Sequence, residues 1–238
     1  METTLPSTRI VLLCVLLGVL ALGWFGWRKY SSLRHPAESP SAAITKQPVN
    51  FTTRTFDPSN PPSDLPAMTP GENAECDSDF ESNASVAGQT QPTDATHAIL
   101  TITKVRMTLQ LNITIWLPTG VTPHVVEHEE GHLQISEAYY RTADKVAARI
   151  AAGFLDRQVE ITGNDLNAES NKALELMAHE ITATYEKELN PEPAQLLYDS
   201  ITDHSRNEVV AKDAVAHALK NVTIESARPE NSDRRPAT

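Results

Sequence analysis

Residues 107–118 read MTLQLNITIWLP, and residues 119–132 continue TGVTPHVVEHEEGH. In the first stretch, apolar residues alternate with mostly polar ones from Met107 to Leu117. This period of two is typical of a strand that buries one face, and Pro118 ends it. The second stretch predicts a turn and then a helix, because Thr122 is a good N-cap and Pro123 suits the first helical position. A strand that leads directly into a helix decides the fold class.

The remaining chain supplies further elements. We expect the first helix to run to about Gly153, a second from about 165 to 189, and a third from about 207 to 219. Residues 99–105 are expected to pair with the strand as a hairpin. The sequence therefore predicts an α+β, zincin-like domain. In it, a small antiparallel sheet packs on the first helix and two further helices.

Charge and cysteine content exclude two broad classes. The chain has 238 residues, with 31 Asp plus Glu against 20 Lys plus Arg, and a net charge of −11. Nucleic-acid affinity depends on clustered Lys and Arg, so we expect no nucleic-acid partner. Cys14 and Cys76 are too few, and too different in setting, for a disulfide scaffold.

Residues 10–27 form an uncharged, mostly apolar run closed by tryptophans. Such a run is just long enough to cross a bilayer as a helix, so we expect a membrane anchor. A cleaved signal peptide is the alternative, with Ala21-Leu22-Gly23 as the cleavage site. Residues 28–94 are rich in proline and predict an extended tether, with a few apolar residues able to pack against the domain. The expected divisions are 1–9 tail, 10–27 anchor, 28–94 tether, 95–222 domain and 223–238 disordered tail.

His128-Glu129-Glu130-Gly131-His132 is an HExxH motif. Residues four apart share one face of a helix, so the two imidazoles can bind one metal while Glu129 reaches a water on it. Both histidines fall on the inward stripe of the predicted helix. Two buried histidines without a partner would be costly, which disfavours a purely structural explanation. The motif therefore predicts Zn²⁺ bound by His128 and His132.

A catalytic zinc needs a third protein ligand and one open position. Six residues after His132, where metzincins have a third histidine, stands Ala138, and Glu137 lies on the opposite side of the helix from His128. The ligand must come from further along the chain. We favour His204, in a polar connection before the last helix. The alternatives are carboxylates of the second helix: Glu169, Glu175 and Glu180.

Three features together resemble a bacterial family catalogued as domain of unknown function nine-two-two and described as secreted zinc-dependent proteases. These are a strand ending in Leu117-Pro118, the HExxH helix continuing as residues 132–137, and a Tyr198-Asp199…Thr202-Asp203-His204 segment. The resemblance covers about residues 99–219 and implies an extracytoplasmic peptidase. Where that family usually has a glycine after the distal histidine, this chain has Ser205.

The motif and its surroundings predict metal-assisted peptide hydrolysis. Zinc would lower the pKa of a water toward about 7, and Glu129 would act as the general base. Tyr198 and Arg206 are candidate donors to the developing oxyanion. Asp199 is expected to hold a ligand histidine in place or to cap a turn. A peptide substrate is expected to add to the sheet edge along 107–117.

Two other classes stay open: a non-catalytic envelope protein stabilised by zinc, and a tethered interaction module. The intact Glu129 argues against the first, because a structural zinc site needs no base. For the compartment, three basic residues after the apolar run favour a cytoplasmic domain, whereas the tether and the family resemblance favour export. We expect a single-pass anchor in the cytoplasmic membrane with the domain outside it, in the periplasm, or a secreted protein if the N-terminal segment is cleaved.

Overall fold

The structure is a computed structural model that describes residues 39–68 and 72–226. The expected anchor at 10–27, the tail at 1–9 and most of the tail at 223–238 lie outside the described residues. No helix in the described part of the chain is long and apolar enough to span a membrane. The strands are β1 (Ser41–Lys46), β2 (Asn50–Phe56), β3 (Glu75–Pro92), β4 (His97–Pro118) and β5 (Gln158–Thr162). The helices are α2 (Pro123–Tyr140), α3 (Ala143–Phe154), α4 (Leu166–Glu188), α5 (Glu192–Thr202) and α6 (Ala211–Ser226).

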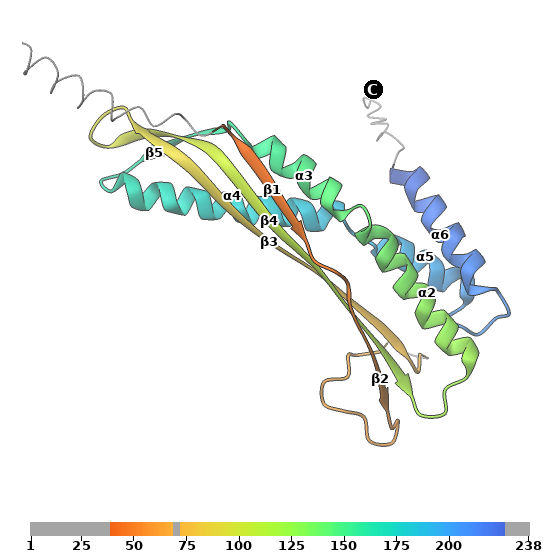
Figure 1. The fold of residues 1–238 in the computed structure, drawn as a ribbon. Helices are drawn as coiled ribbons and strands as arrows, with labels where there is room; N and C mark the ends of the chain where they lie inside the picture. The colour runs from red at the N-terminus through yellow and green to blue at the C-terminus, as the bar shows by residue number, and fades with distance from the viewer. Residues whose placement is uncertain (1–38, 69–71, 227–238) are drawn as a thin grey trace, which may run out of the picture. The chain divides into compact units, whose positions relative to one another are not determined.

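Strand β4 is the centre of a five-stranded mixed sheet (Figure 1). It pairs with β3 in the antiparallel sense over almost its whole length. The same β4 residues also pair with β1 and β2 in the parallel sense and with β5 in the antiparallel sense. A strand has only two edges, so β3 occupies one edge of β4, and β1, β2 and β5 share the other. No strand of the described residues pairs with the outer edge of β3.

The α+β class is confirmed, but the sheet differs from the expected antiparallel hairpin. Residues 99–105 and 107–117 belong to one continuous strand instead of two. The buried positions are Ala98, Leu100 and Ile102, and then Val105 and Met107. The register with β3 shifts at this point, which leaves Thr103 as an extra residue. After this bulge, the buried side chains fall on odd-numbered positions instead of even-numbered ones. In the sequence, such a change in the apolar alternation resembles a turn between two strands.

Three strands come from the segment expected to be a tether. β1, β2 and β3 all lie between residues 41 and 92, and β3 forms the longest ladder of the sheet. The inward positions of β3 carry small or polar side chains such as Cys76, Ser78 and Ala84. Phe80 and Val86 are the larger inward side chains that pack against the core, but they stand among small and polar residues, so the composition alone gives little sign of the strand.

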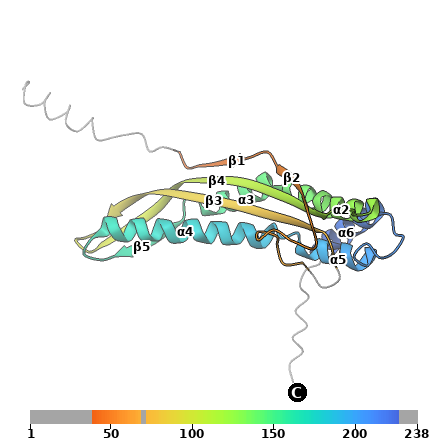
Figure 2. The same cartoon turned by 90° about the horizontal axis from the view of Figure 1, so that it is seen from below.

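Helices α3 and α4 cover one face of the sheet (Figures 1 and 2). The core beneath them joins β4 side chains such as Leu109 and Leu111 to Ile150 of α3 and Ile181 of α4, and all four are at most 5% exposed. The first helix was expected to continue to Gly153, but it ends at Tyr140. α3 then begins a new segment, after a turn at Thr142 in which the hydroxyl donates to the Tyr139 carbonyl at 3.0 Å.

Helix α5 replaces part of the expected polar connection at 198–207. It starts next to Pro191 and packs through the buried residues Ala194 and Tyr198 against α2 and α6. The connection itself is confined to residues 203–210. As a result, Asp199 lies on a rigid helix that faces the HExxH motif, and His204 lies in the loop after it.

Candidate metal centre

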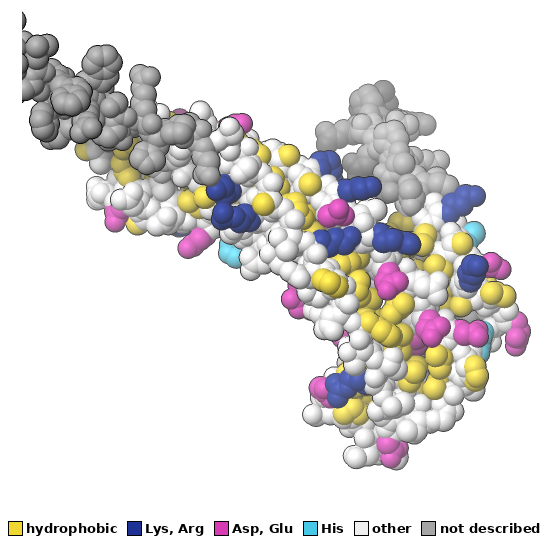
Figure 3. All heavy atoms as spheres, viewed as in Figure 1, with side chains coloured by type: hydrophobic (Ala, Val, Ile, Leu, Met, Phe, Trp, Pro, Cys, Tyr) yellow, Lys and Arg dark blue, Asp and Glu magenta, His cyan; other side chains and the backbone are white. Residues whose placement is uncertain are grey.

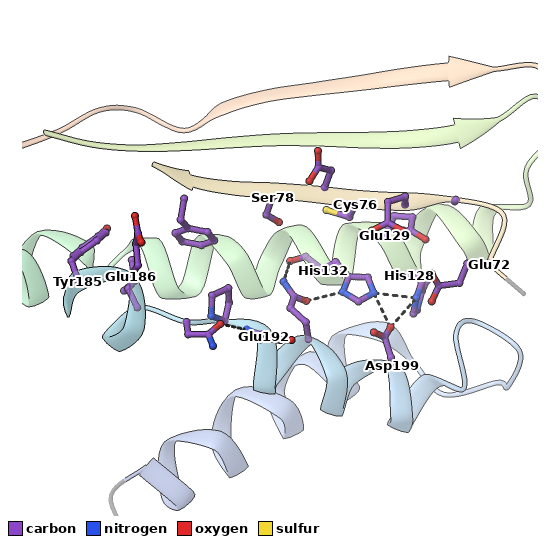
Figure 4. A pocket seen from close by; sticks show the side chains of 18 residues that line it. Glu72, Cys76, Ser78, His128, Glu129, His132, Tyr185, Glu186, Glu192 and Asp199 are labelled. Carbon is purple, nitrogen blue, oxygen red and sulfur yellow. Dashed lines mark hydrogen bonds and ion pairs between the residues drawn. The ribbon is translucent and has the colours of Figure 1, made fainter. Parts of the chain in front are cut away.

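Three side chains from two helices converge on one point. His128 and His132 project from α2, and their Nε2 atoms are 3.2 Å apart. Asp199 projects from α5, and its Oδ1 lies 2.9 Å from Nε2 of His132 and 3.5 Å from Nε2 of His128 (Figure 4). This is the spacing of a group that could hold a metal ion. The motif histidines are therefore brought together, and a carboxylate completes the group.

The residues present fit a divalent cation. His128 Nδ1 is a buried atom without a hydrogen-bond partner among the described residues, and the buried Asp199 Oδ1 makes no aligned hydrogen bond there although it lies 2.9 Å from His132 Nε2. A buried polar atom left unpaired is destabilising, and a cation at the meeting point would satisfy the carboxylate oxygen. Imidazole nitrogen and carboxylate oxygen are also among the ligands that such cations take in proteins.

The carboxylate of Asp199 and the imidazole of His132 shift one another's pKa values toward their charged forms. Burial alone would raise the pKa of Asp199, but the imidazoles of His128 and His132 hold it well below its usual range. Burial likewise acts to lower the pKa of His132, yet contacts with Asp199, Gln195 and Glu129 raise it above its usual value. The site thus favours positive charge between the carboxylate and the imidazoles.

Gln195 fixes the orientation of His132. Its Oε1 lies 2.7 Å from His132 Nδ1, and its amide nitrogen donates to the His132 carbonyl at 3.1 Å and to Ser136 Oγ at 3.0 Å. Because Gln195 Oε1 only accepts, the proton of His132 belongs on Nδ1, which leaves Nε2 free to bind a cation. Sequence reasoning missed Gln195. It lies four residues before Asp199, on the same face of α5, so recognising that helix would have revealed it.

Tyr198 packs against the motif histidines. Its ring stacks on His128 with centroids 5.1 Å apart, and its hydroxyl donates to the His128 carbonyl at 3.1 Å. The side chain is fully buried, and it does not line the cavity described below. Tyr198 therefore contacts His128 from the side away from the cavity wall and is not among the groups that could meet a substrate in the cavity, as the expected oxyanion donor would. A Cβ at Gly131 would overlap its hydroxyl, so the glycine within the motif allows this close approach.

Glu129 lies in the wall of a cavity of about 480 Å³ beside the three converging side chains (Figure 4). It is 4% exposed and has no hydrogen-bond or ion-pair partner among the described residues. Burial raises its pKa to about 8, although His132 acts in the opposite direction. A buried carboxylate with a raised pKa beside a candidate metal centre is suited to proton transfer. Cys76 also lines this cavity, but burial raises the pKa of its thiol, so it is no thiolate nucleophile.

His204 lies next to this group but not within it. Its Nδ1 is 2.5 Å from Oε1 of Glu72 and 3.9 Å from Oδ1 of Asp199. Together these three form a second cluster that shares Asp199 with the first. The backbone of His204 is left-handed, with φ of 51°, as it is in the two neighbouring residues. Asp199, and not the expected His204, thus forms a group with the two motif histidines, while His204 belongs to the second group with Glu72 and Asp199.

The other expected residues lie away from the cavity. Arg206 is exposed and pairs with Asp203 at 2.8 Å, so it is not placed to donate to a substrate in the cavity. None of Glu169, Glu175 and Glu180 of α4 lines the cavity. The expected substrate edge along 107–117 is also wrong, because both edges of β4 are already paired there. The open edge next to the cavity belongs to β3, whose residues 75–78 line it.

No family model matches the chain, and no curated protein or solved structure matches it either. The family resemblance drawn from the sequence therefore stays a prediction, and the functional argument depends on the site itself.

Proposed function

We propose that the protein is a zinc-dependent peptidase. His128, His132 and Asp199 would hold the zinc, and Glu129 would be the general base. One observation carries this proposal: the two HExxH histidines and the half-buried carboxylate of Asp199 converge at the wall of a cavity that Glu129 also lines. Three protein ligands leave a position open, as a catalytic zinc requires.

Each group of the chain then has a distinct role. When bound, zinc supplies a Lewis acid that lowers the pKa of a water and polarises the substrate carbonyl. Glu129 takes a proton from the attacking water and returns it to the leaving nitrogen. Gln195 and Tyr198 hold the histidines in position. The outer edge of β3 offers main-chain hydrogen bonds to an extended peptide beside the cavity.

A second candidate is a non-catalytic protein that keeps zinc for stability, as the sequence also allowed. It draws support from His204, whose Nδ1 approaches Asp199 to 3.9 Å and would close the site if it bound the same ion. The two candidates differ in what Glu129 does, because only the peptidase needs a base.

The deciding experiment compares Glu129→Gln with wild type for zinc content and for hydrolysis of fluorescein-labelled casein. We expect Glu129→Gln to retain zinc and to lose hydrolysis by about 100-fold or more, because it removes the base and no ligand. His132→Ala should lose both. Glu130→Gln is the matched control, since Glu130 is the exposed neighbour on α2. Full hydrolysis by Glu129→Gln, or none by the zinc-loaded wild type, would contradict the proposal.

A further inference from the structure

The cavity beside the candidate metal centre is strongly acidic. Besides Glu129 and Asp199, it is lined by Glu72, Glu75, Asp77, Glu186 and Glu192, and by no Lys or Arg of the described residues. On the face drawn in Figure 3, by contrast, basic and acidic side chains are interspersed. A concave wall that carries one sign of charge focuses the electric field and attracts the opposite charge.

The protein leaves most of this charge without a counter-ion. Glu72 pairs with His204, but Glu75, Asp77, Glu186 and Glu192 have no ion-pair partner among the described residues. Burial raises the pKa of Glu75, and the nearby carboxylates raise it further. Glu75 is therefore close enough to Glu72, Asp77 and Asp199 for these charges to repel one another, and a cation from outside the chain would relieve this repulsion.

A single divalent cation does not balance the cavity. Asp199 and the outer carboxylates Asp77, Glu186 and Glu192 together carry more negative charge than one such ion would neutralise. Glu129 is 4% exposed, has no partner and faces the cavity, which marks the cavity as a place where a ligand binds. Figure 4 shows Glu186 and Glu192 on the side of His132 that faces the end of α4, and Glu72 beside His128 at the other end. The outer charges thus flank the metal centre on both sides.

We propose that this cavity selects peptides with a Lys or Arg side chain next to the bond that is cut, and that Glu186 and Glu192 receive that side chain. The inference rests on the proposed peptidase function and specifies its substrate class. A peptide lying along the outer edge of β3 directs alternate side chains to opposite faces, so a side chain beside the cut bond can enter the cavity. Glu186, near the end of α4, and Glu192, at the start of α5, are the exposed glutamates of the cavity lining and are the groups available to a long cationic side chain.

The test uses the zinc-loaded full-length protein and pairs of internally quenched peptides. The peptides of a pair differ only in having Lys or norleucine at one position, which is scanned on both sides of the cut bond. At the best position we expect kcat/KM to be about tenfold higher for Lys at low salt, and the ratio to fall as KCl is added. Glu186→Gln and Glu192→Gln should each lower the ratio about twofold to fivefold. Glu175→Gln, an exposed change on α4 away from the cavity, should leave it unchanged.

The outcomes separate this inference from the proposed function. Equal kcat/KM for the Lys and norleucine peptides overturns the inference and leaves the peptidase standing. If the wild type cuts no peptide, the peptidase proposal fails, and binding of the same peptides to Glu129→Gln decides the inference. Tighter binding of the Lys peptides would support cation recognition without hydrolysis. Equal binding would overturn the inference as well.

Discussion

At the scale of single residues, the proposed ligand set of the candidate metal centre depends on Asp199. Its Oδ1 is buried, lies 2.9 Å from His132 Nε2 and has no aligned hydrogen bond. His204 instead contacts Glu72. Loss of a hydrogen bond that only supports a ligand lowers metal affinity by about 10–100-fold. We expect Asp199→Ala to lower zinc affinity by more than this, because it removes a ligand. His204→Ala should retain most of the zinc. Equilibrium dialysis followed by elemental analysis measures both.

The matched control for this comparison is Asp203→Ala. Asp203 is an exposed carboxylate in the same loop and pairs only with Arg206. Its loss should leave zinc affinity unchanged. If His204→Ala removed the zinc while Asp199→Ala kept it, His204 would be the third ligand, as the sequence had suggested, and Asp199 would act through the histidines.

At the scale of elements, the sequence predicted the strands and helices in which apolar side chains recur at a regular spacing. The alternation at 107–117 lies within β4, and the second predicted helix, 165–189, matches α4 at 166–188. β3 was missed because most of its inward side chains are small or polar, so that Phe80 and Val86 alone do not give an apolar pattern. Helix α5 was missed because Pro191 and Pro193 at its start suggest a loop, although proline is well tolerated in a first helical turn.

The residues of the candidate site were also predicted only in part. The motif supplied His128, Glu129 and His132 directly, because their spacing on one helix is itself the signal. The group that completes the site depends on how α5 packs against α2, which is a tertiary contact with no local pattern. Asp199 was therefore noticed only as a supporting residue, and Gln195 was not noticed at all.

The contact between α2 and α5 gives a prediction about stability. A Cβ at Gly131 would overlap the Tyr198 hydroxyl, whereas one at Gly153 of α3 meets nothing within 4 Å. We expect Gly131→Ala to destabilise the protein by about 1–3 kcal/mol through overpacking. Gly153→Ala should be neutral or stabilise it by up to about 1 kcal/mol, because alanine favours the helix. Urea unfolding measures both. Equal effects of the two changes would contradict the close packing of α2 against α5.

At the scale of the whole molecule, the folded unit extends well upstream of the HExxH motif. β3 pairs with β4 from Glu75 to Pro92 and also forms part of the cavity wall. We expect a chain of residues 40–238 to unfold cooperatively on heating and to bind zinc. A chain of residues 95–238 should do neither, because it exposes one edge of β4 and lacks β1 and β2 on the other. Circular dichroism and zinc content distinguish the two. A folded, zinc-binding 95–238 chain would show that the first three strands are dispensable.

Protons and metal should compete for the same site, and this competition should govern how stability depends on pH. In the metal-free protein the pKa of Glu129 is raised to about 8, above its ordinary value of 4.5, and the pKa of His132 is also raised. The folded state therefore holds more protons than the unfolded state in this range, so stability should fall as pH rises from about 5 to 8. Zinc binds deprotonated ligands, so the stabilisation it adds should grow over the same range. We expect Tm in EDTA to fall between pH 6 and 8, and the difference in Tm between zinc and EDTA to widen. Glu129→Gln should flatten the decline in EDTA, because it removes the carboxylate that must ionise while buried. An EDTA profile with the same slope for wild type and Glu129→Gln would show that Glu129 is not the group that titrates.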